Sequence, residues 1–510
     1  MKNLPPESKS LWREKAPQSF PALKEDIDTE VCVIGGGIVG VSTAFMLARR
    51  GIKAALIEAD RMGAGTSGYT TAKISSQHGL KYSSLIDTFG EQEARLYYDA
   101  NEDAIAWMER MCKKLAIDCN FERQASYVYA ETQEGAENIN KEVEAYRRLE
   151  LDGRLSEETE LPFPVESAIM MHDQAQFHPL RFLSKLLRYL EVENTPVYEN
   201  TKAVDIKRGK RPQVLMENGN VITADHVVMA THYPFKDLQA LFAARLHVER
   251  SYAVAFRIEG KIPQGMYLNA ESPKRSIRNA VDPDGNRLLL IGGEGHTSGQ
   301  KDDTLQNYEA LRQFGLEHFK VKDIPYRWSA QDLMTLDGMP YIGPVTPGKE
   351  DIFTAAGFGK WGMAMGVGAA TIIADHISGK NNPYTKLFTP SRFTPSQDIK
   401  NAVKENMSVA RSYVKGKMDR KSRNKLEDLA NGEGAVVNFD GNRAGAYKNE
   451  HGEITIVDTT CTHMGCELSW NNGETSWDCP CHGSRFDVDG TVLEGPAVKP
   501  LTQLKKEEPK

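Results

Sequence analysis

Two short segments near the end of the chain gather cysteine and histidine at metal-ligand spacing. They read Cys461-Thr462-His463-Met464-Gly465-Cys466 and Cys479-Pro480-Cys481-His482-Gly483-Ser484, so each holds one cysteine, one histidine and a further cysteine. Such crowding is typical of a metal-binding or redox-active site rather than of a disulfide scaffold. Thiolate sulfur and imidazole nitrogen bind both zinc and iron, so the residue types alone leave the metal open.

A glycine-rich turn near the start of the chain has the spacing of a dinucleotide site. A buried-strand pattern at 31–34 leads into Gly35-x-Gly37-x-x-Gly40, and an apolar helix is predicted over 41–50. The glycines permit a tight turn, a close approach of the backbone to a pyrophosphate, and close packing of helix on strand. A second strand over 53–58 ends at Glu58, which is placed to accept hydrogen bonds from a ribose diol. The pattern predicts a βαβ unit with its phosphate site at the first turn.

The chain must divide into several parts to position these two sites. Its 510 residues are too many for one hydrophobic core. Helical periodicity covers 83–115 and 134–149, and strand patterns follow at 214–216, 221–230, 253–258 and 287–291, which predicts a substrate domain interleaved with the nucleotide domain. We predict an N-terminal extension at 1–27, a large domain at 28–388, a linker with a basic helix at 389–427, and a small metal-binding domain at 428–510.

The composition restricts the partners. Hydrophobic residues make up 40% of the chain and charged residues 26%, as in ordinary globular proteins, and the formal net charge of -7 is mild, so we expect no nucleic acid to bind. No stretch reaches the roughly 18 apolar residues that a membrane span needs, so we predict no transmembrane segment and a cytoplasmic location. We expect a small molecule or another protein as the partner.

Further motifs resemble the FAD-dependent D-amino-acid oxidase (DAO) superfamily. They are Gly65-Thr66-Ser67-Gly68-Tyr69-Thr70-Thr71-Ala72-Lys73, His226-Val227-Val228-Met229-Ala230-Thr231-His232, Asp337-Gly338-Met339-Pro340-Tyr341-Ile342-Gly343 and Ala356-Gly357-Phe358-Gly359-Lys360-Trp361-Gly362-Met363. The resemblance spans roughly residues 28 to 385. It implies an α/β FAD-binding Rossmann-like domain of the DAO and glutathione-reductase type, with an interleaved α+β substrate domain.

The same resemblance implies which residues hold FAD. They are Gly35, Gly37, Gly40, Glu58, Thr70, Thr71, Ala72, Lys73, Val204, Gly359, Lys360, Trp361, Gly362 and Met363. No second glycine-rich turn with a ribose-binding acid follows a strand, so no separate nicotinamide domain is predicted. Family members oxidise amines or amino acids without an obligatory acid or base. Arg278 and Arg327 are therefore only candidate carboxylate anchors, and we favour ordinary structural roles for them.

The two C-terminal segments resemble Rieske [2Fe-2S] proteins, in a stretch from about 432 to 501 that predicts a small all-β domain. The resemblance assigns Cys461 and Cys479 to one iron, His463 and His482 to the other, and a disulfide to Cys466 and Cys481, as in the quinol-oxidising complexes. Gly495-Pro496-Ala497 resembles the loop that covers the cluster. Phe486 stands where high-potential members have Tyr, so one hydrogen bond to the cluster is missing and a lower potential is expected. A zinc site built from the same ligands is the alternative.

Together these features predict an FAD-dependent oxidoreductase that oxidises an amine-like or amino-acid-like small molecule. Its electrons would pass one at a time to its own Rieske cluster and then to an external acceptor, a protein or a quinone. The alternative is a non-catalytic electron-transfer or redox-sensing protein. A third hypothesis has exposed His463 and His482 dock a quinone while the basic stretch at 400–425 touches a membrane. Cys32, Cys112, Cys119, His178 and His232 are predicted to be structural residues.

Overall fold

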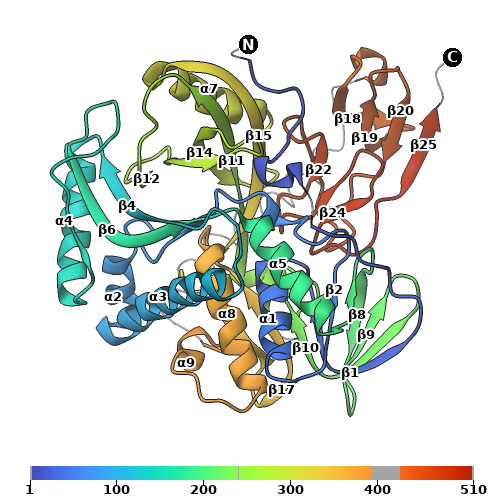
Figure 1. The fold of residues 1–510 in the computed structure, drawn as a ribbon. Coiled ribbons are helices and arrows are strands. Elements are labelled where there is room, and N and C mark those ends of the chain that lie inside the picture. The colour runs from blue at the N-terminus through green and yellow to red at the C-terminus, as the bar shows by residue number, and fades with distance from the viewer. Residues whose placement is uncertain (1–2, 16, 239, 393–424, 508–510) are drawn as a thin grey trace.

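The computed structural model describes residues 3–15, 17–238, 240–392 and 425–507 (Figure 1). The basic helix predicted in the linker falls on residues 393–424, which lie outside the described residues. Among the helices of the described ranges, none combines the length and apolarity that crossing a bilayer requires.

The first sheet contains the predicted βαβ unit. In the part of the chain that the structure describes, it has eight strands: β16 (Tyr341–Thr346), β17 (Lys349–Ala356), β10 (Val221–Met229), β1 (Ile27–Ile34), β2 (Ala54–Ile57) and β7 (Val197–Tyr198) in spatial order, with β8 (Ala203–Lys207) and β9 (Gln213–Met216) beside β10. β1 pairs in parallel with both β2 and β10. Its last four residues are buried, because a central parallel strand is covered on both faces.

Helices pack against this sheet, against a second large sheet, and on one another. They are α1 (Ile38–Ala48), α2 (Tyr82–Phe89), α3 (Glu91–Lys114), α4 (Gln133–Arg148), α5 (Pro179–Val192), α6 (Phe242–Arg245), α7 (Leu305–His318), α8 (Gly362–Ile377) and α9 (Thr385–Phe388). The helix predicted over 83–115 is two helices, because Gly90 adopts a φ of 92° between α2 and α3. α1 packs between α5 and α8, so the glycine-rich turn leads into a buried helix.

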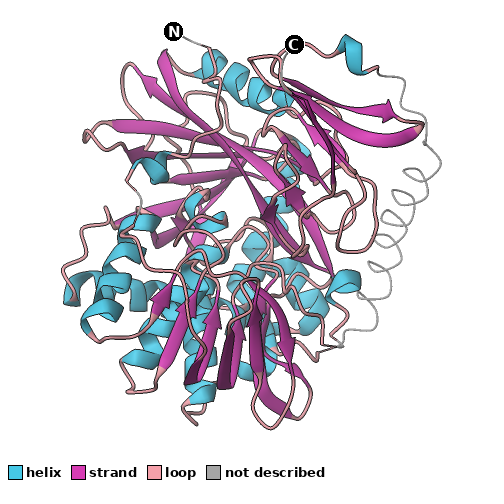
Figure 2. Cartoon of the chain, turned by 90° about the vertical axis from the view of Figure 1, so that its right-hand side faces the viewer, coloured by secondary structure: helices cyan, strands magenta, loops and turns pink. Residues whose placement is uncertain are grey.

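A second large sheet lies above the first in the views of Figures 1 and 2. Its described strands are β15 (Val321–Thr335), β11 (Leu246–Ile258), β14 (Arg287–Thr297), β13 (Arg275–Val281), β12 (Met266–Asn269), β4 (Glu122–Ala130), β6 (Ser167–Gln176) and β3 (Lys73–Ile74) in spatial order, with β5 (Gly153–Leu155) on β6. The chain crosses between the two sheets several times. The predicted α/β domain with an interleaved substrate domain is therefore confirmed.

The C-terminal part is a small all-β unit, as predicted. One antiparallel sheet contains β18 (Glu433–Phe439), β19 (Asn442–Lys448), β20 (Ile454–Val457) and β25 (Gln503–Glu507), and the other contains β21 (Ser469–Asn471), β22 (Ser476–Asp478), β23 (Arg485–Phe486) and β24 (Val492–Glu494). The second sheet and its loops have their own core, in which Trp477 and Phe486 are fully buried among the cysteines. We call residues 425–507 the small domain.

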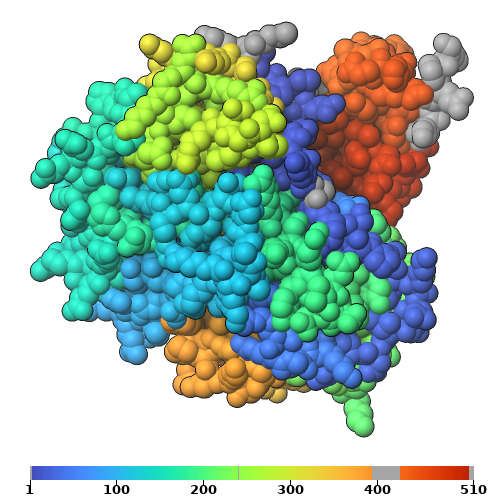
Figure 3. All heavy atoms as spheres, viewed as in Figure 1, coloured from blue at the N-terminus to red at the C-terminus, as the bar shows by residue number. Residues whose placement is uncertain are grey.

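The N-terminal segment binds the parts together. Figure 3 shows it running between the second large sheet and the small domain. Ser8 donates a hydrogen bond to Glu474 of the small domain at 3.0 Å, and a short 3₁₀ helix at Leu11–Glu14 buries Trp12 to 1% exposure. Within the predicted N-terminal extension at 1–27, Leu11 and Trp12 belong to the main hydrophobic core.

Candidate cofactor sites

The glycine-rich turn has the close contacts that the dinucleotide pattern requires. Gly35 has a φ of 115°, and a Cβ atom on it would lie 2.3 Å from the carbonyl oxygen of Ala230. A Cβ atom on Gly40 would lie 1.9 Å from the carbonyl oxygen of Gly35. Larger residues at either position would therefore push the turn away from α1 and from β10. Gly37 precedes the first residue of α1, Ile38, whose N–H donates to the hydroxyl of Ser67 at 2.9 Å, and the N-terminal end of a helix favours an anion.

Glu58 lies beside this turn, immediately after β2. Its carboxylate accepts hydrogen bonds from the backbone N–H of Gly36 at 2.6 Å and of Asp60 at 2.9 Å. Burial raises the pKa of Glu58, while these N–H groups act in the opposite direction. Val204 lies on the nearby β8 at a break in its pairing with β9. The chain before β8 contacts the same edge, since the N–H of Thr201 donates to the carbonyl oxygen of Glu58 at 2.8 Å.

Side chains from distant parts of the sequence donate hydrogen bonds to main-chain carbonyl oxygens of the segment from Thr70 to Lys73. Trp12 donates from its indole N–H to the carbonyl oxygen of Thr70 at 2.6 Å. Arg278 donates to the carbonyl oxygens of Thr71 at 2.7 Å and of Ala72 at 2.6 Å. Ala72 adopts a φ of 57°, a conformation that costs energy for a residue with a side chain, and the hydrogen bond from Arg278 to its carbonyl oxygen supports it. We call residues 70–73 the flavin loop, after the prediction that they run past the flavin.

The guanidinium of Arg278 therefore already donates its hydrogen bonds to the flavin loop. Its side chain is 2% exposed, and burial lowers the pKa of its guanidinium to about 9. Arg327 lies elsewhere: its guanidinium donates to the carbonyl oxygens of Pro5, Pro6 and Gly473, and it stacks over Tyr308. The structure thus places neither arginine as a free carboxylate anchor, and each cross-links main-chain segments.

Lys73 ends the flavin loop with a buried amine. Its Nζ atom donates to the carbonyl oxygen of Tyr267 at 3.3 Å and lies 5.8 Å from the centre of the Trp361 ring. Burial, together with the positive charge of Arg278, lowers the pKa of Lys73 to about 7. The ring of His78 stacks on that of Trp361, with the ring centres 4.5 Å apart. The site therefore combines an amine that can lose its proton near neutral pH, Lys73, with the stacked rings of Trp361 and His78.

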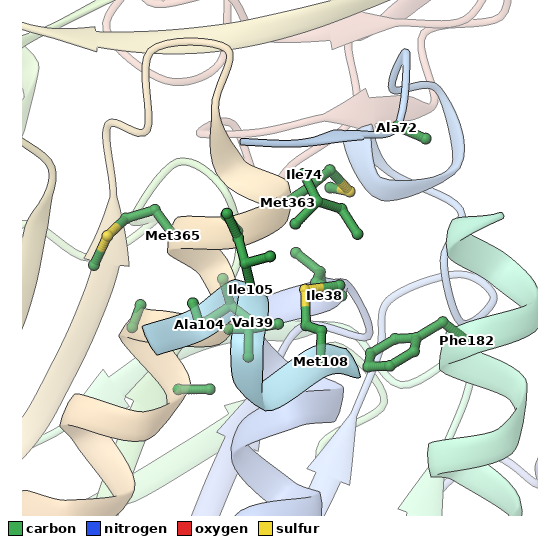
Figure 4. Packing of buried hydrophobic residues seen from close by; sticks show 14 of the residues in the cluster. Ile38, Val39, Ala72, Ile74, Ala104, Ile105, Met108, Phe182, Met363 and Met365 are labelled. Carbon is green, nitrogen blue, oxygen red and sulfur yellow. The ribbon is translucent and has the colours of Figure 1, made fainter. Parts of the chain in front are cut away.

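The helix α8 begins beside α1. Figure 4 shows Met363 of α8, Ile38 of α1 and Ile74 of β3 lying close together in the main core. A Cβ atom on Gly366 would lie 2.9 Å from Ile38, so the two helices approach closely at their first turns. Gly359 and Lys360, with φ of 58° and 75°, form the turn from β17 into α8. Lys360 pairs with Glu249 of β11 at 2.8 Å.

The two Cys/His segments come together at one end of the small domain. Cys466 and Cys481 form a disulfide with an S–S distance of 2.07 Å, and the Sγ atom of Cys479 lies within 4.8 Å of both of their sulfurs. The side chains of Cys461 and Cys479 contact each other, and a hydrogen bond from Cys479 lowers the pKa of Cys461 to about 7. Two free thiols are therefore adjacent and buried, with exposed fractions of 2% and 1%.

The two histidines complete a set of donors that fits a mixed thiolate and imidazole cluster. Their ring centres are 5.0 Å apart, and the Nδ1 atoms of His463 and His482 are buried and find no hydrogen-bond partner among the described residues. Two unpaired buried nitrogens beside two free thiols are costly unless a metal centre takes them as ligands. The hydroxyl of Ser484 accepts a hydrogen bond from the N–H of Ala497 at 3.0 Å, which places the Gly495-Pro496-Ala497 loop against the site.

The histidine face of the small domain is covered by the large domain. The ring of His463 lies 6.5 Å from that of Tyr233, and the main chain of Ala243 hydrogen-bonds the ring of His482. His482 is only 5% exposed. The expectation that His463 and His482 are exposed is therefore wrong for His482, and His463 is half-buried. The reason is tertiary: the segment after β10 covers a surface that the small domain alone would leave open.

Buried polar contacts fasten this interface. The side-chain amide of Gln331 on β15 donates to the carbonyl oxygen of Gly483 at 2.9 Å, and the main-chain carbonyl oxygen of Gln331 accepts from the hydroxyl of Thr66, four residues before the flavin loop, at 3.3 Å. The guanidinium of Arg250 lies 3.6 Å from the carboxylate of Asp478, with both side chains at most 2% exposed. Sequence patterns missed Trp12, Tyr233 and Gln331, because their contacts join segments far apart in the chain and leave no local signal.

Comparison with known proteins agrees with this geometry. A family model described as FAD dependent oxidoreductase (DAO) matches residues 30–376, and one for the Rieske [2Fe-2S] domain matches residues 422–505. The Bacillus subtilis protein YhfW, named as a Rieske 2Fe-2S iron-sulfur protein, is 42% identical over 486 residues, which cover 95% of each chain. Gamma-glutamylputrescine oxidoreductase of Escherichia coli is 24% identical over 382 residues, 71% of this chain and 86% of that protein.

Among solved structures, glycine oxidase from Geobacillus kaustophilus is similar with a TM-score of 0.60 at 20% identity, covering 72% of this chain and 99% of that one. This likeness supports the fold of the large domain. The match over residues 30–376 covers more than half of the chain. The chain therefore belongs to the FAD dependent oxidoreductase (DAO) family, and it carries a Rieske [2Fe-2S] domain at its C-terminal end.

Proposed function

We propose that this FAD-dependent oxidoreductase oxidises an amine-like or amino-acid-like small molecule and passes the electrons one at a time to its own Rieske cluster and then to an external acceptor. The substrate class is supported by the names of two similar proteins, gamma-glutamylputrescine oxidoreductase and glycine oxidase. When bound, FAD takes a hydride equivalent from a substrate carbon, and the [2Fe-2S] cluster accepts single electrons.

The observation that carries the relay is the position of the cluster site against the dinucleotide turn. Ala230 packs on Gly35 of that turn, and Tyr233, three residues later, packs on His463. One short segment therefore spans from the dinucleotide turn to a proposed cluster ligand. An external donor would have to displace the large domain to reach the buried His482, whereas this segment links the turn that would hold FAD to the neighbourhood of His463.

We assign the cluster ligands from the donor set. Cys461 and Cys479 would hold one iron and His463 and His482 the other, with the Cys466–Cys481 disulfide joining the two loops. A zinc site from the same four residues is the competing assignment. Metal analysis of the purified protein separates the two, because iron with acid-labile sulfide in equal amounts supports the cluster, and zinc without sulfide contradicts it.

We assign FAD to the turn, the flavin loop and the start of α8. The residues are Gly35, Gly37, Gly40, Glu58, Thr70, Thr71, Ala72, Lys73, Val204, Gly359, Lys360, Trp361, Gly362 and Met363. The N-terminal end of α8 supports this assignment, since the positive end of a helix dipole stabilises the negative charge of a reduced flavin. Lys73, neutral above a pH of about 7, would accept the proton that an ammonium substrate must lose before its carbon can be oxidised.

The test is anaerobic reduction of the holoprotein with a panel of amines and amino acids. We expect one chemical class to bleach the flavin absorbance and, in the same sample, to produce the rhombic low-temperature EPR signal of a reduced mixed-ligand cluster. Cys479→Ser should bleach its flavin without that signal, while Cys32→Ser, a buried cysteine of β1, should behave as the wild type. Full-speed reoxidation of the flavin by air with the cluster still oxidised would contradict the relay.

The second candidate is a non-catalytic carrier or redox sensor. It would be favoured if dithionite reduces both centres but no amine or amino acid bleaches the flavin. The buried amine of Lys73 beside an aromatic wall argues for turnover instead, because a carrier needs no group that can change protonation next to its flavin.

A further inference from the structure

A second pair of cysteines lies in contact, away from both cofactor sites. The Sγ atoms of Cys112, near the end of α3, and Cys119, in the loop before β4, are 3.6 Å apart. The loop turns back because the N–H of Ile117 donates to the carbonyl oxygen of Cys112 at 2.9 Å. Burial of both side chains agrees with the prediction that they are structural, but burial alone does not require the two sulfurs to meet.

The pair opens into a surface cavity of about 380 Å³. Cys112 is 9% exposed and Cys119 fully buried, so a reagent in the cavity meets Cys112 first. Glu109 lines the same cavity and pairs with Lys113 at 2.7 Å and with Arg123 at 2.6 Å. The mouth is therefore polar and charged, with room for a small hydrophilic molecule.

We propose that Cys112 and Cys119 form a reversible dithiol–disulfide site that reacts with low-molecular-weight disulfides. Cys112, as the thiolate, attacks one sulfur of the disulfide, whose S–S bond breaks and releases one thiol after uptake of a proton. Cys119 then loses its proton and attacks the sulfur of Cys112, which forms the Cys112–Cys119 bond and releases the second thiol. The two cysteines lose two electrons and two protons, and the small disulfide gains them as two thiols.

The environment of the two sulfurs gives them different roles. The hydrogen bond from Cys119 lowers the pKa of Cys112, while the same contact and burial raise the pKa of Cys119. The more accessible sulfur is thus the better thiolate, which suits the attacking residue, and the buried one suits the resolving residue. Closing the bond requires the sulfurs to approach from 3.6 Å to about 2.05 Å. Cys119 lies in a loop, so a side-chain rotation with a small loop shift can supply this movement.

The site lies next to the elements that hold the flavin loop. The N–H of His178, which caps α5, donates to the carbonyl oxygen of Cys119 at 2.6 Å. The ring of His178 in turn packs on Trp12 at 5.1 Å, and Trp12 donates to Thr70 of the flavin loop. A disulfide here would therefore form two packed side chains away from the flavin loop.

The test exposes the folded holoprotein to oxidised glutathione, followed by alkylation in denaturant and peptide mass analysis. We expect the wild type to lose two alkylatable thiols, to show a Cys112–Cys119 cross-linked peptide, and to regain both thiols with dithiothreitol. Cys119→Ser should instead accumulate a glutathione adduct on Cys112. Cys32→Ser, which removes a fully buried cysteine of β1, is the matched control and should cross-link as the wild type does.

Two results would overturn the proposal. One is that both cysteines remain alkylatable in the folded wild type under conditions that cross-link them in the unfolded chain. The other is that the wild type stops at a glutathione adduct on Cys112, since a resolving Cys119 would have displaced it. Both results come from the wild type alone, so a variant that fails to fold does not affect the decision.

Discussion

At the scale of single residues, Lys73 is a group whose charge changes near neutral pH. Its ordinary pKa of 10.5 is lowered to about 7 by burial, so the amine is charged below and neutral above that pH. If it accepts a proton from an ammonium substrate, the rate of flavin reduction rises as the pH increases through about 7. Lys73→Met should lower this rate by roughly 10²-fold and remove the transition, as anaerobic stopped-flow absorbance measures.

Lys141→Met provides the control for this pH effect, because Lys141 is an exposed lysine of α4. It should keep both the rate and the transition. A transition near pH 7 that persists in Lys73→Met would show that another group, or the substrate itself, titrates there.

Phe486 sets the second expectation at this scale. It is fully buried in the core that contains Cys461 and Cys479, and its side chain offers no hydrogen bond. A hydroxyl near the cluster sulfurs stabilises the extra negative charge of the reduced state. Phe486→Tyr should therefore raise the reduction potential by roughly 60 mV, the equivalent of ~1.4 kcal/mol for one electron, in an EPR-monitored redox titration.

Ser484→Ala is the complementary change, since the Ser484 hydroxyl contacts Cys461. Its potential should fall. If Phe486→Tyr leaves the potential unchanged in a correctly folded protein, the added hydroxyl does not reach the cluster.

At the scale of elements, Arg278 and Arg327 distinguish holding a loop from holding a substrate. Arg278, on β13, fastens the flavin loop through the carbonyl oxygens of Thr71 and Ala72. A lysine ammonium cannot reproduce the planar guanidinium that donates to both carbonyl oxygens. Arg278→Lys should therefore weaken FAD binding by about tenfold, which corresponds to the loss of one charge-assisted hydrogen bond. Fluorescence titration of the FAD-depleted protein measures the affinity.

Arg327→Lys is the matched variant, because its guanidinium contacts the N-terminal segment and Gly473 but not the flavin loop. Its FAD affinity should be unchanged. An Arg278→Lys protein with normal FAD affinity and a raised KM for substrate would instead make Arg278 a substrate anchor.

At the scale of the whole molecule, the small domain presents its histidine face to the large domain. His482 is 5% exposed, and the ring of His463 faces Tyr233. A quinone can hydrogen-bond to His482 only if the two domains separate. We therefore expect that a hydrophobic quinone analogue, added to the reduced holoprotein, leaves the g-values of the cluster unchanged.

A shifted EPR spectrum on addition of the analogue would show that the histidine face opens in solution, which would favour quinone docking. The interface argues against opening, because separation would leave the buried guanidinium of Arg250 without its carboxylate, whereas Asp478 would keep Arg485 of the small domain at 3.2 Å. The external acceptor would then take electrons at another surface of the small domain.

Local sequence patterns were sufficient to predict the elements whose structure depends on residues close together in the chain. The strand, glycine turn and helix at 31–50 follow from steric requirements within one βαβ unit, and the structure confirms β1, α1 and β2. The fold class and both cofactors could likewise be predicted, because the motifs for FAD and for the cluster lie within short segments. The helix over 83–115 was predicted as one piece, and Gly90 divides it because its left-handed φ cannot continue a helix.

The amino-acid sequence by itself was sufficient to predict FAD and a [2Fe-2S] cluster as the cofactors, since spacing within a loop decides whether neighbouring donors can converge. Only the tertiary structure decided what surrounds those sites. Arg278 meets the flavin loop, Tyr233 covers His463, and Cys112 meets Cys119 across a folded turn. The first two contacts join residues far apart in the chain, and the third depends on how one loop turns back. Packing of whole elements, rather than any local periodicity, therefore determines which charges are buried and which faces of the cluster site are closed.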